Sequence, residues 1–194
     1  AKDFPLFPGE QITEGLDGLA GRLKEYYDMG ARFTKWRAVI SIGDGLPTDQ
    51  CIKANAHALA RYAGLSQEQG MVPIIEPEVL LDGPHSFAQS EEITTKTLQL
   101  VFDEVKFYRV YLPGLVLKTS MVIPGSTSGE QVSPEQIAEA TVRCLKKSVP
   151  AETGGVVFLS GGQTAEQATE NLNAIAKLGP HPWPVSFSYA RALQ

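Results

Sequence analysis

The sequence predicts an α/β protein with a parallel sheet and crossover helices. Three observations carry this prediction: helical and strand-like apolar periods take turns along the chain, no exact repeat or low-complexity linker interrupts them, and 43% of the residues are apolar. The length of 194 residues fits one domain, residues 1–194. No apolar stretch reaches the roughly 18 residues of a membrane span, so we expect a soluble globular protein without a membrane partner.

The first half of the chain alternates helix and strand signals. Leu16, Leu19 and Leu23 fall at helical spacing and predict a first helix, which Gly30 ends. The elements expected after it are a strand at 33–40, a helix around 52–63, a strand at 71–75 and a helix over about 91–108.

The second half contains the best-marked helix start. Residues 133–136, Ser-Pro-Glu-Gln, form a predicted capping box with proline at the first helical position. Residues 164–167 open a later helix, which the Gly-Pro pair at 179–180 closes. The strands expected around these helices lie at 116–123, 155–159 and 185–189.

Five strands, four helices between them and one leading helix are similar to the later part of a (β/α)8 barrel, roughly strands 4 to 8. A complete barrel of this kind usually has about 250 residues. The predicted repeat starts on a loop and helix with no strand ahead of them, and the chain stops where the next helix would begin. We therefore expect the 194 residues to be part of a longer polypeptide.

Three charged residues stand within apolar, strand-like runs: Lys35, Glu76 and Lys118. Each residue also has a purely structural explanation. Lys35 could be a solvated strand end, Glu76 could cap a helix or face water, and Lys118 could snorkel to solvent or pair with an acid. An isolated buried ion is costly unless partners relieve it, so three such charges on three strands indicate a site. A buried ammonium loses hydration, and its neutral amine can attack a carbonyl. Lys118 is therefore the candidate nucleophile, at the strand ends where barrels build their active sites.

Two loops are candidate phosphate sites. Ser160, Gly161 and Gly162 follow an apolar strand and lead into a capped helix, so backbone N–H groups can approach an anion there. Residues 188–191 repeat this arrangement after the last strand and add the guanidinium of Arg191. A Gly-Gly pair alone is usually a plain turn, but barrels often hold phosphate after their last two strands. Together with the lysines and the carboxylate, these loops suggest carbonyl chemistry on a phosphorylated sugar.

Composition excludes several other classes. The net charge is −5, with 22 acidic and 17 basic residues and no basic block, which argues against a nucleic-acid partner. Cys51 and Cys144 stand singly and are expected to be buried thiols in a reducing compartment. No cluster of histidines and carboxylates has metal-ligand spacing, so we assign no metal and no cofactor.

Five ordered motifs strengthen the interpretation. They strongly resemble class I fructose-bisphosphate aldolase, the Schiff-base family, and the likeness runs from residue 15 to residue 194. The motifs are ARFTKWR (31–37), VPIIEPEVLLDG (72–83), LVLKTSMVIPG (115–125), FLSGGQ (158–163) and FSYARALQ (187–194).

The resemblance implies a role for each candidate residue. Lys118 matches the lysine that forms a Schiff base with the substrate ketone, Glu76 the glutamate that shuttles protons, and Lys35 the lysine that supports the charge beside it. The residues that the resemblance assigns to substrate and phosphate are Ser160, Gly161, Gly162, Tyr189, Ala190, Arg191 and Arg37, with the 189–190 turn acting through its backbone.

The resemblance also implies reversible cleavage of fructose 1,6-bisphosphate, a homotetramer, and a location in the cytoplasm or a plastid. Two alternatives stay open at this point. One is another lysine-dependent sugar-phosphate aldolase or transaldolase on the same barrel, and the other is a non-catalytic, aldolase-like module that binds a protein.

Overall fold

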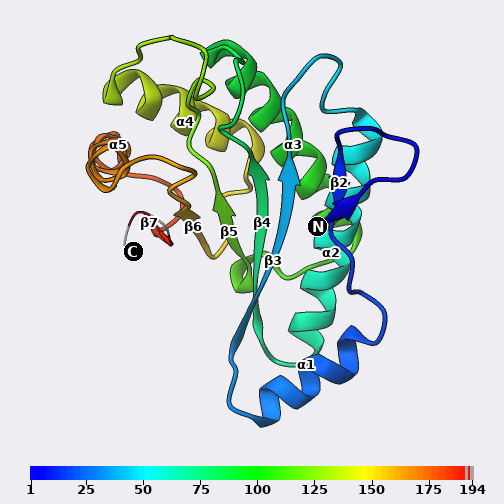
Figure 1. Ribbon diagram of the computed structural model, residues 1–194. Coiled ribbons are helices and arrows are strands. Elements are labelled where there is room, and N and C mark those ends of the chain that lie inside the picture. Colours follow the sequence, from blue (N-terminus) through cyan, green and yellow to red (C-terminus); the bar gives the residue numbers. More distant parts are fainter. Residues whose placement is uncertain (191, 193–194) are drawn as a thin grey trace.

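A computed structural model describes residues 1–190 and 192 of the protein. Five strands form one parallel sheet in the order β3-β4-β5-β6-β7, which confirms the predicted parallel α/β class (Figure 1). The strands of this sheet are β3 (Phe33–Ile40), β4 (Val72–Val79), β5 (Val116–Thr119), β6 (Gly155–Phe158) and β7 (Val185–Phe187).

Helices connect each strand to the next one. Helices α2, α3 and α4 lie along one face of the sheet, α5 stands at its β6–β7 end, and α1 lies beyond the start of β3 (Figure 1). The helices are α1 (Leu19–Asp28), α2 (Asp49–Glu68), α3 (Phe87–Phe107), α4 (Pro134–Ser148) and α5 (Ala165–Lys177), with a 3-10 turn, η1 (Leu112–Gly114), before β5. The prediction of five strands with four crossover helices is therefore confirmed.

Capping boxes open the last three helices. The predicted box at Ser133 is present, and Thr164 forms another at the predicted start of the later helix. Each side chain accepts a hydrogen bond from the third residue of its helix. The predicted start of α3 near residue 91 was wrong. The box formed by Ser86 and Gln89 starts this helix at Phe87, because it satisfies backbone N–H groups a full turn earlier.

Two further predictions of the elements need correction. The strand expected at 116–123 ends at Thr119, and Val122 donates its backbone N–H to Thr141 of α4 instead of to a neighbouring strand. Met121 and Val122 stay buried there, so the apolar run outlasts the strand. Two antiparallel strands of two residues each, β1 (Lys2–Asp3) and β2 (Gln11–Ile12), precede α1, where no strand was expected.

The core lies between the sheet and its helices. Alternate strand residues, such as Ile75, Leu117 and Phe158, are fully buried in it. Both cysteines are also buried on helices that cover the sheet, as predicted. Burial raises the pKa of each thiol to about 11, so both remain protonated at neutral pH.

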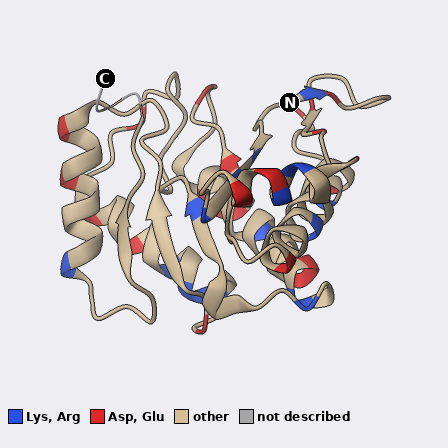
Figure 2. Ribbon diagram, turned by 90° about the horizontal axis from the view of Figure 1, so that it is seen from below, with Lys and Arg blue, Asp and Glu red and all other residues tan. Residues whose placement is uncertain are grey.

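The surface carries both signs of charge. Acidic and basic segments are interspersed over the helices (Figure 2). No helix among the described residues is long and apolar enough to cross a membrane.

Candidate active site

The three charged residues singled out from the sequence meet at the carboxyl half of the sheet. Lys118 Nζ lies 3.1 Å from Glu76 Oε1, and Lys35 Nζ lies 2.7 Å from Glu76 Oε2. One carboxylate therefore forms ion pairs with two lysines, one at each oxygen, and it also accepts a hydrogen bond from Lys35. The Glu76 side chain is 4% exposed and that of Lys118 is 11% exposed, whereas that of Lys35 is 43% exposed. Lys35 therefore lies at the solvent-exposed edge of the site. The sequence-based prediction that its charge is buried was wrong.

The strand register explains why these side chains meet. Residues paired across a parallel sheet share a face, and every second residue along a strand returns to that face. Arg37 pairs with Glu76, which places Lys35 on the same face, and Ile74 pairs with Val116, which places Lys118 there. This is the face opposite the helices.

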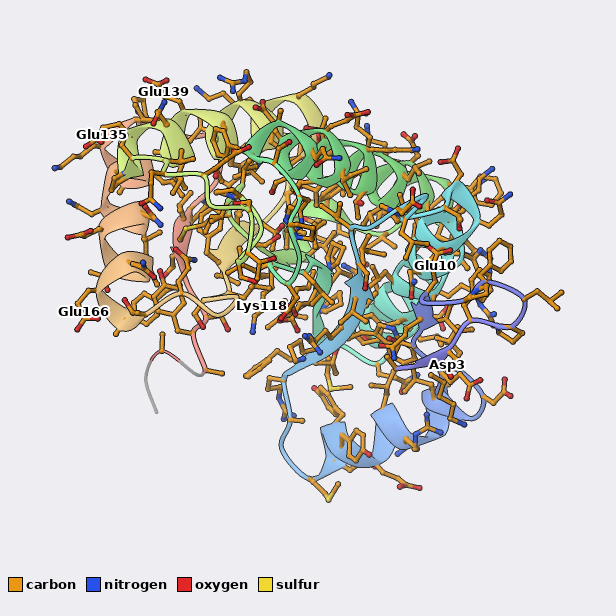
Figure 3. All side chains as sticks on the ribbon, turned by 45° about the horizontal axis from the view of Figure 1, so that its top comes forward. Asp3, Glu10, Lys118, Glu135, Glu139 and Glu166 are labelled. Atoms are coloured by element: carbon orange, nitrogen blue, oxygen red, sulfur yellow. The ribbon has the colours of Figure 1, made fainter. Side chains whose placement is uncertain are left out.

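A cleft of about 520 Å³ contains the three charges. Its walls come from the ends of β3 to β7, and it also includes Asp82 and Ser188. Figure 3 shows Lys118 near the middle of the molecule, whereas Glu135, Glu139 and Glu166 lie at its periphery on α4 and α5. The candidate site therefore lies in the interior of the molecule, apart from the acidic side chains on the outer helices.

Glu78 is a cleft residue that the sequence reasoning missed. It is 5% exposed and accepts a hydrogen bond from Arg37 Nε, and this bond raises the pKa of Arg37. The signal was present, because Glu76 and Glu78 are two residues apart on one strand and so share a face. Arg37, expected at the phosphate, lies in the cleft with its Nε held by this carboxylate.

The first candidate phosphate loop forms a tight turn after β6. Gly161 and Gly162 have φ angles of +62° and +95°, and Gln163 donates its backbone N–H to Ser160 O at 3.1 Å. Two consecutive positive φ values are those of a type I′ turn, which explains the Gly-Gly pair. Ser160 and Gly161 line the cleft of Lys118, whereas Gly162 lines a neighbouring cleft.

The second candidate loop reaches the same cleft through Ser188 and Ala190. The phenol of Tyr189 points elsewhere, because it donates a hydrogen bond to the carbonyl of Ala168 on α5 at 2.7 Å. Tyr189 does not line the cleft, so a role for its backbone in phosphate binding stays a prediction. Arg191 lies outside the described residues.

Two loops at the carboxyl end of the sheet are joined backbone to backbone. Gly125 donates its N–H to the carbonyl of His85 at 2.8 Å, and Thr127 donates to Gly83 at 3.0 Å. A Cβ atom on Gly125 would lie 2.2 Å from the oxygen of Gly83, so only glycine fits there. The junction holds the β4–α3 loop, which supplies Leu81 and Asp82 to the cleft.

Fold and site together define a parallel α/β protein with a lysine–glutamate centre on the face of its sheet opposite the helices. Comparisons with known proteins specify the family. The family model described as "Fructose-bisphosphate aldolase class-I" matches residues 3–194. The chain belongs to this family.

Individual relatives agree with that assignment. A probable fructose-bisphosphate aldolase class 1 of Xylella fastidiosa (strain 9a5c) is 58% identical over 193 residues, which are 98% of this chain and 58% of the relative. The cytosolic fructose-bisphosphate aldolase 4 of Arabidopsis thaliana is 52% identical over 187 residues, 96% of this chain and 48% of that protein.

A solved structure shares the fold. The fructose-bisphosphate aldolase of Plasmodium falciparum, in a ternary complex with TRAP and a small-molecule inhibitor, matches with a TM-score of 0.97 at 48% identity. The match covers 99% of this chain and 56% of that one. The chain therefore corresponds to part of a (β/α)8 barrel, and it spans about half the length of the relatives it matches.

Proposed function

We propose that the protein containing this chain cleaves fructose 1,6-bisphosphate reversibly into dihydroxyacetone phosphate and glyceraldehyde 3-phosphate through a Schiff base on Lys118. The observation that carries the proposal is the placement of Lys118 Nζ, 3.1 Å from the buried Glu76 carboxylate in a cleft open to a ligand. Family membership supports the choice of substrate.

The first steps are addition and dehydration. Glu76, whose Oε1 lies 3.1 Å from Lys118 Nζ, takes a proton from the lysine and so frees the amine to attack the ketone carbon and form a carbinolamine. Glu76 then returns this proton to the carbinolamine hydroxyl, which leaves as water, while one N–H proton stays on the nitrogen. The product is a cationic iminium. Lys35, which contacts the other carboxylate oxygen, keeps Glu76 oriented towards Lys118 as charge moves.

The iminium then accepts the electron pair of the C3–C4 bond. As this bond breaks, the C4 hydroxyl passes its proton to the Glu76 carboxylate, glyceraldehyde 3-phosphate leaves, and an enamine remains on Lys118. Protonation of the enamine at C3 and hydrolysis of the resulting iminium return dihydroxyacetone phosphate and the free lysine. The buried carboxylate opposite the nitrogen stabilises the cation while it exists.

We assign phosphate recognition to the backbone around Ser160 and Gly161 and to the 188–190 turn, which line the same cleft as Lys118. By family resemblance, Gly162, Arg37 and Arg191 contribute to this binding, the protein assembles as a tetramer, and it works in the cytoplasm. The relatives in Arabidopsis thaliana and Pisum sativum are named as cytosolic or cytoplasmic enzymes.

Covalent trapping tests the proposal. The full-length protein is incubated with dihydroxyacetone phosphate, reduced with borohydride and mapped by mass spectrometry. We expect one adduct, on the peptide that contains Lys118, and none in Lys118→Met. Lys146→Met, at an exposed lysine of α4, is the matched control and should trap like the unchanged protein. An adduct on another lysine, or cleavage by Lys118→Met at the normal rate, would overturn the mechanism.

A further inference from the structure

A buried relay of two side-chain amides lies behind the Ser160–Gly162 turn. Asn171, on α5, donates from Nδ2 to Gln163 Oε1 at 2.7 Å. Gln163 in turn donates from Nε2 to the carbonyl of Ser160 at 2.9 Å. Asn171 is 5% exposed and Gln163 is 9% exposed, so water does not compete freely for either bond.

The relay has one workable direction. The carbonyl of Ser160 can only accept, so Gln163 must present its NH2 group to it and its oxygen to Asn171. Asn171 must then donate. A side chain at position 171 that could only accept would draw the NH2 group of Gln163 towards itself and turn its oxygen against the carbonyl of Ser160.

This carbonyl determines where a neighbouring N–H points. A peptide unit is planar, and its C=O and N–H point in opposite directions. The carbonyl of Ser160 is held towards Gln163 by two donors, the backbone N–H at 3.1 Å and the side-chain amide at 2.9 Å. The N–H of Gly161 belongs to the same peptide unit, so it is directed away from α5. Gly161 lines the Lys118 cleft.

The relay also contacts the segment that follows the strand of Lys118, and α5 holds the second loop as well. Gln163 Nε2 lies 3.8 Å from the sulfur of Met121, three residues after Lys118. Tyr189 donates to the Ala168 carbonyl, one turn before Asn171. One helix thus fixes both candidate phosphate loops from behind.

We infer that Asn171 and Gln163 are positioning residues for phosphate recognition: the relay fixes the Ser160–Gly161 peptide so that its N–H meets a phosphate group of the substrate. The inference rests on the proposed function and adds to it the structural element that aims the donor. Neither side chain touches the reacting atoms.

Asn171→Asp tests the relay in the full-length enzyme, because it preserves size and replaces the donor by an acceptor. Asn173→Asp makes the same change at an exposed position two residues on and is the matched control. Two ketones serve as probes for borohydride trapping on Lys118: dihydroxyacetone phosphate, and dihydroxyacetone, which has no phosphate. With Asn171→Asp we expect trapping of the phosphate ester at limiting concentration to fall about tenfold, and trapping of the unphosphorylated ketone to stay unchanged.

Steady-state kinetics give a second readout. The KM for fructose 1,6-bisphosphate should rise about tenfold with kcat little changed, because the lost interaction is present in ground and transition states alike. Equal loss for both ketones would mean that Asn171 only maintains the fold, and an unchanged preference for the phosphate ester would mean that the turn needs no relay. Either result overturns the inference.

Failure of the proposed function is distinguishable from failure of the relay. If the unchanged protein traps neither ketone, the Schiff-base assignment falls. The relay is then judged with inorganic phosphate, followed through the amide resonances of Gly161 and Gly162. Phosphate shifts in the unchanged protein that are lost in Asn171→Asp but kept in Asn173→Asp support it, and the same shifts in all three proteins contradict it.

Discussion

Two regions of the molecule use the same kinds of residue with different results. In α1, Lys24 Nζ and Asp28 Oδ2 are 2.7 Å apart, the same distance that separates Lys35 and Glu76 in the cleft. The α1 pair is largely exposed on both sides, at 68% and 60%, whereas the Glu76 side chain is 4% exposed. The bond to Asp28 raises the pKa of Lys24, but water and salt screen that pair. Distance alone therefore does not tell which ion pair matters; burial of the carboxylate does.

Removing each carboxylate gives the sharpest test of this contrast. Glu76→Gln leaves the ammonium groups of Lys35 and Lys118 without their shared counter-ion, and we expect a loss of about 3 kcal/mol in the free energy of unfolding. Asp28→Asn removes an exposed partner and should leave stability within experimental error. Urea unfolding of the full-length protein measures both. Equal effects of the two substitutions would show that burial does not separate the pairs.

Two glycines extend the contrast between buried and exposed positions, because replacing each by alanine should change the free energy of unfolding in opposite directions. Gly125→Ala puts a Cβ atom 2.2 Å from the oxygen of Gly83 and should cost about 2 kcal/mol by overpacking. Gly21→Ala, within α1, meets nothing within 4 Å and should stabilise the protein by about 0.5 kcal/mol through helix propensity. Thermal unfolding of the two variants checks the signs. A neutral Gly125→Ala would mean that the two loops can separate at no cost.

Titration of a core thiol has a smaller expected effect than Glu76→Gln or Gly125→Ala. Burial raises the pKa of Cys144 from 9.0 to about 11, so the folded state keeps its proton where the unfolded state loses it. Stability from this group is complete below pH 9 and falls as the pH rises towards 11, by about 1 kcal/mol between pH 7 and pH 10. Urea unfolding at several pH values measures the slope. Cys144→Ala should flatten it, and an unchanged slope in that variant would assign the loss to other groups.

The sequence predicted most of what is local. The boxes at Ser133 and Thr164 could be found because their residues are three apart and need no tertiary contact. The box at Ser86 has the same spacing, but it follows Gly83-Pro84, which indicated a loop, and so it was overlooked. The end of β5 was beyond prediction, since Met121 and Val122 remain buried after leaving the sheet.

The residues of the candidate site also fall into two groups: those that the sequence indicated and those that only tertiary packing reveals. Charged residues in apolar strands pointed to Glu76 and Lys118, and both are buried in one cleft. Their contact depends on strand register, which sequence alone does not show. Gln163 and Asn171 gave no signal, because polar residues in a turn or within a helix are ordinarily solvated. Only the packing of α5 against the turn makes them buried partners.

Every βα unit contributes to the cleft, and Lys35, Glu76, Lys118 and Ser160 follow one another at intervals of about forty residues. Such distant contacts form late when a chain folds, because long loops must close first. On a growing or partly unfolded chain, Lys118 has no carboxylate beside it. The lysine–glutamate pair comes into being only when the β4 and β5 units have docked, so the candidate nucleophile and its partner are assembled by the same step that builds the sheet.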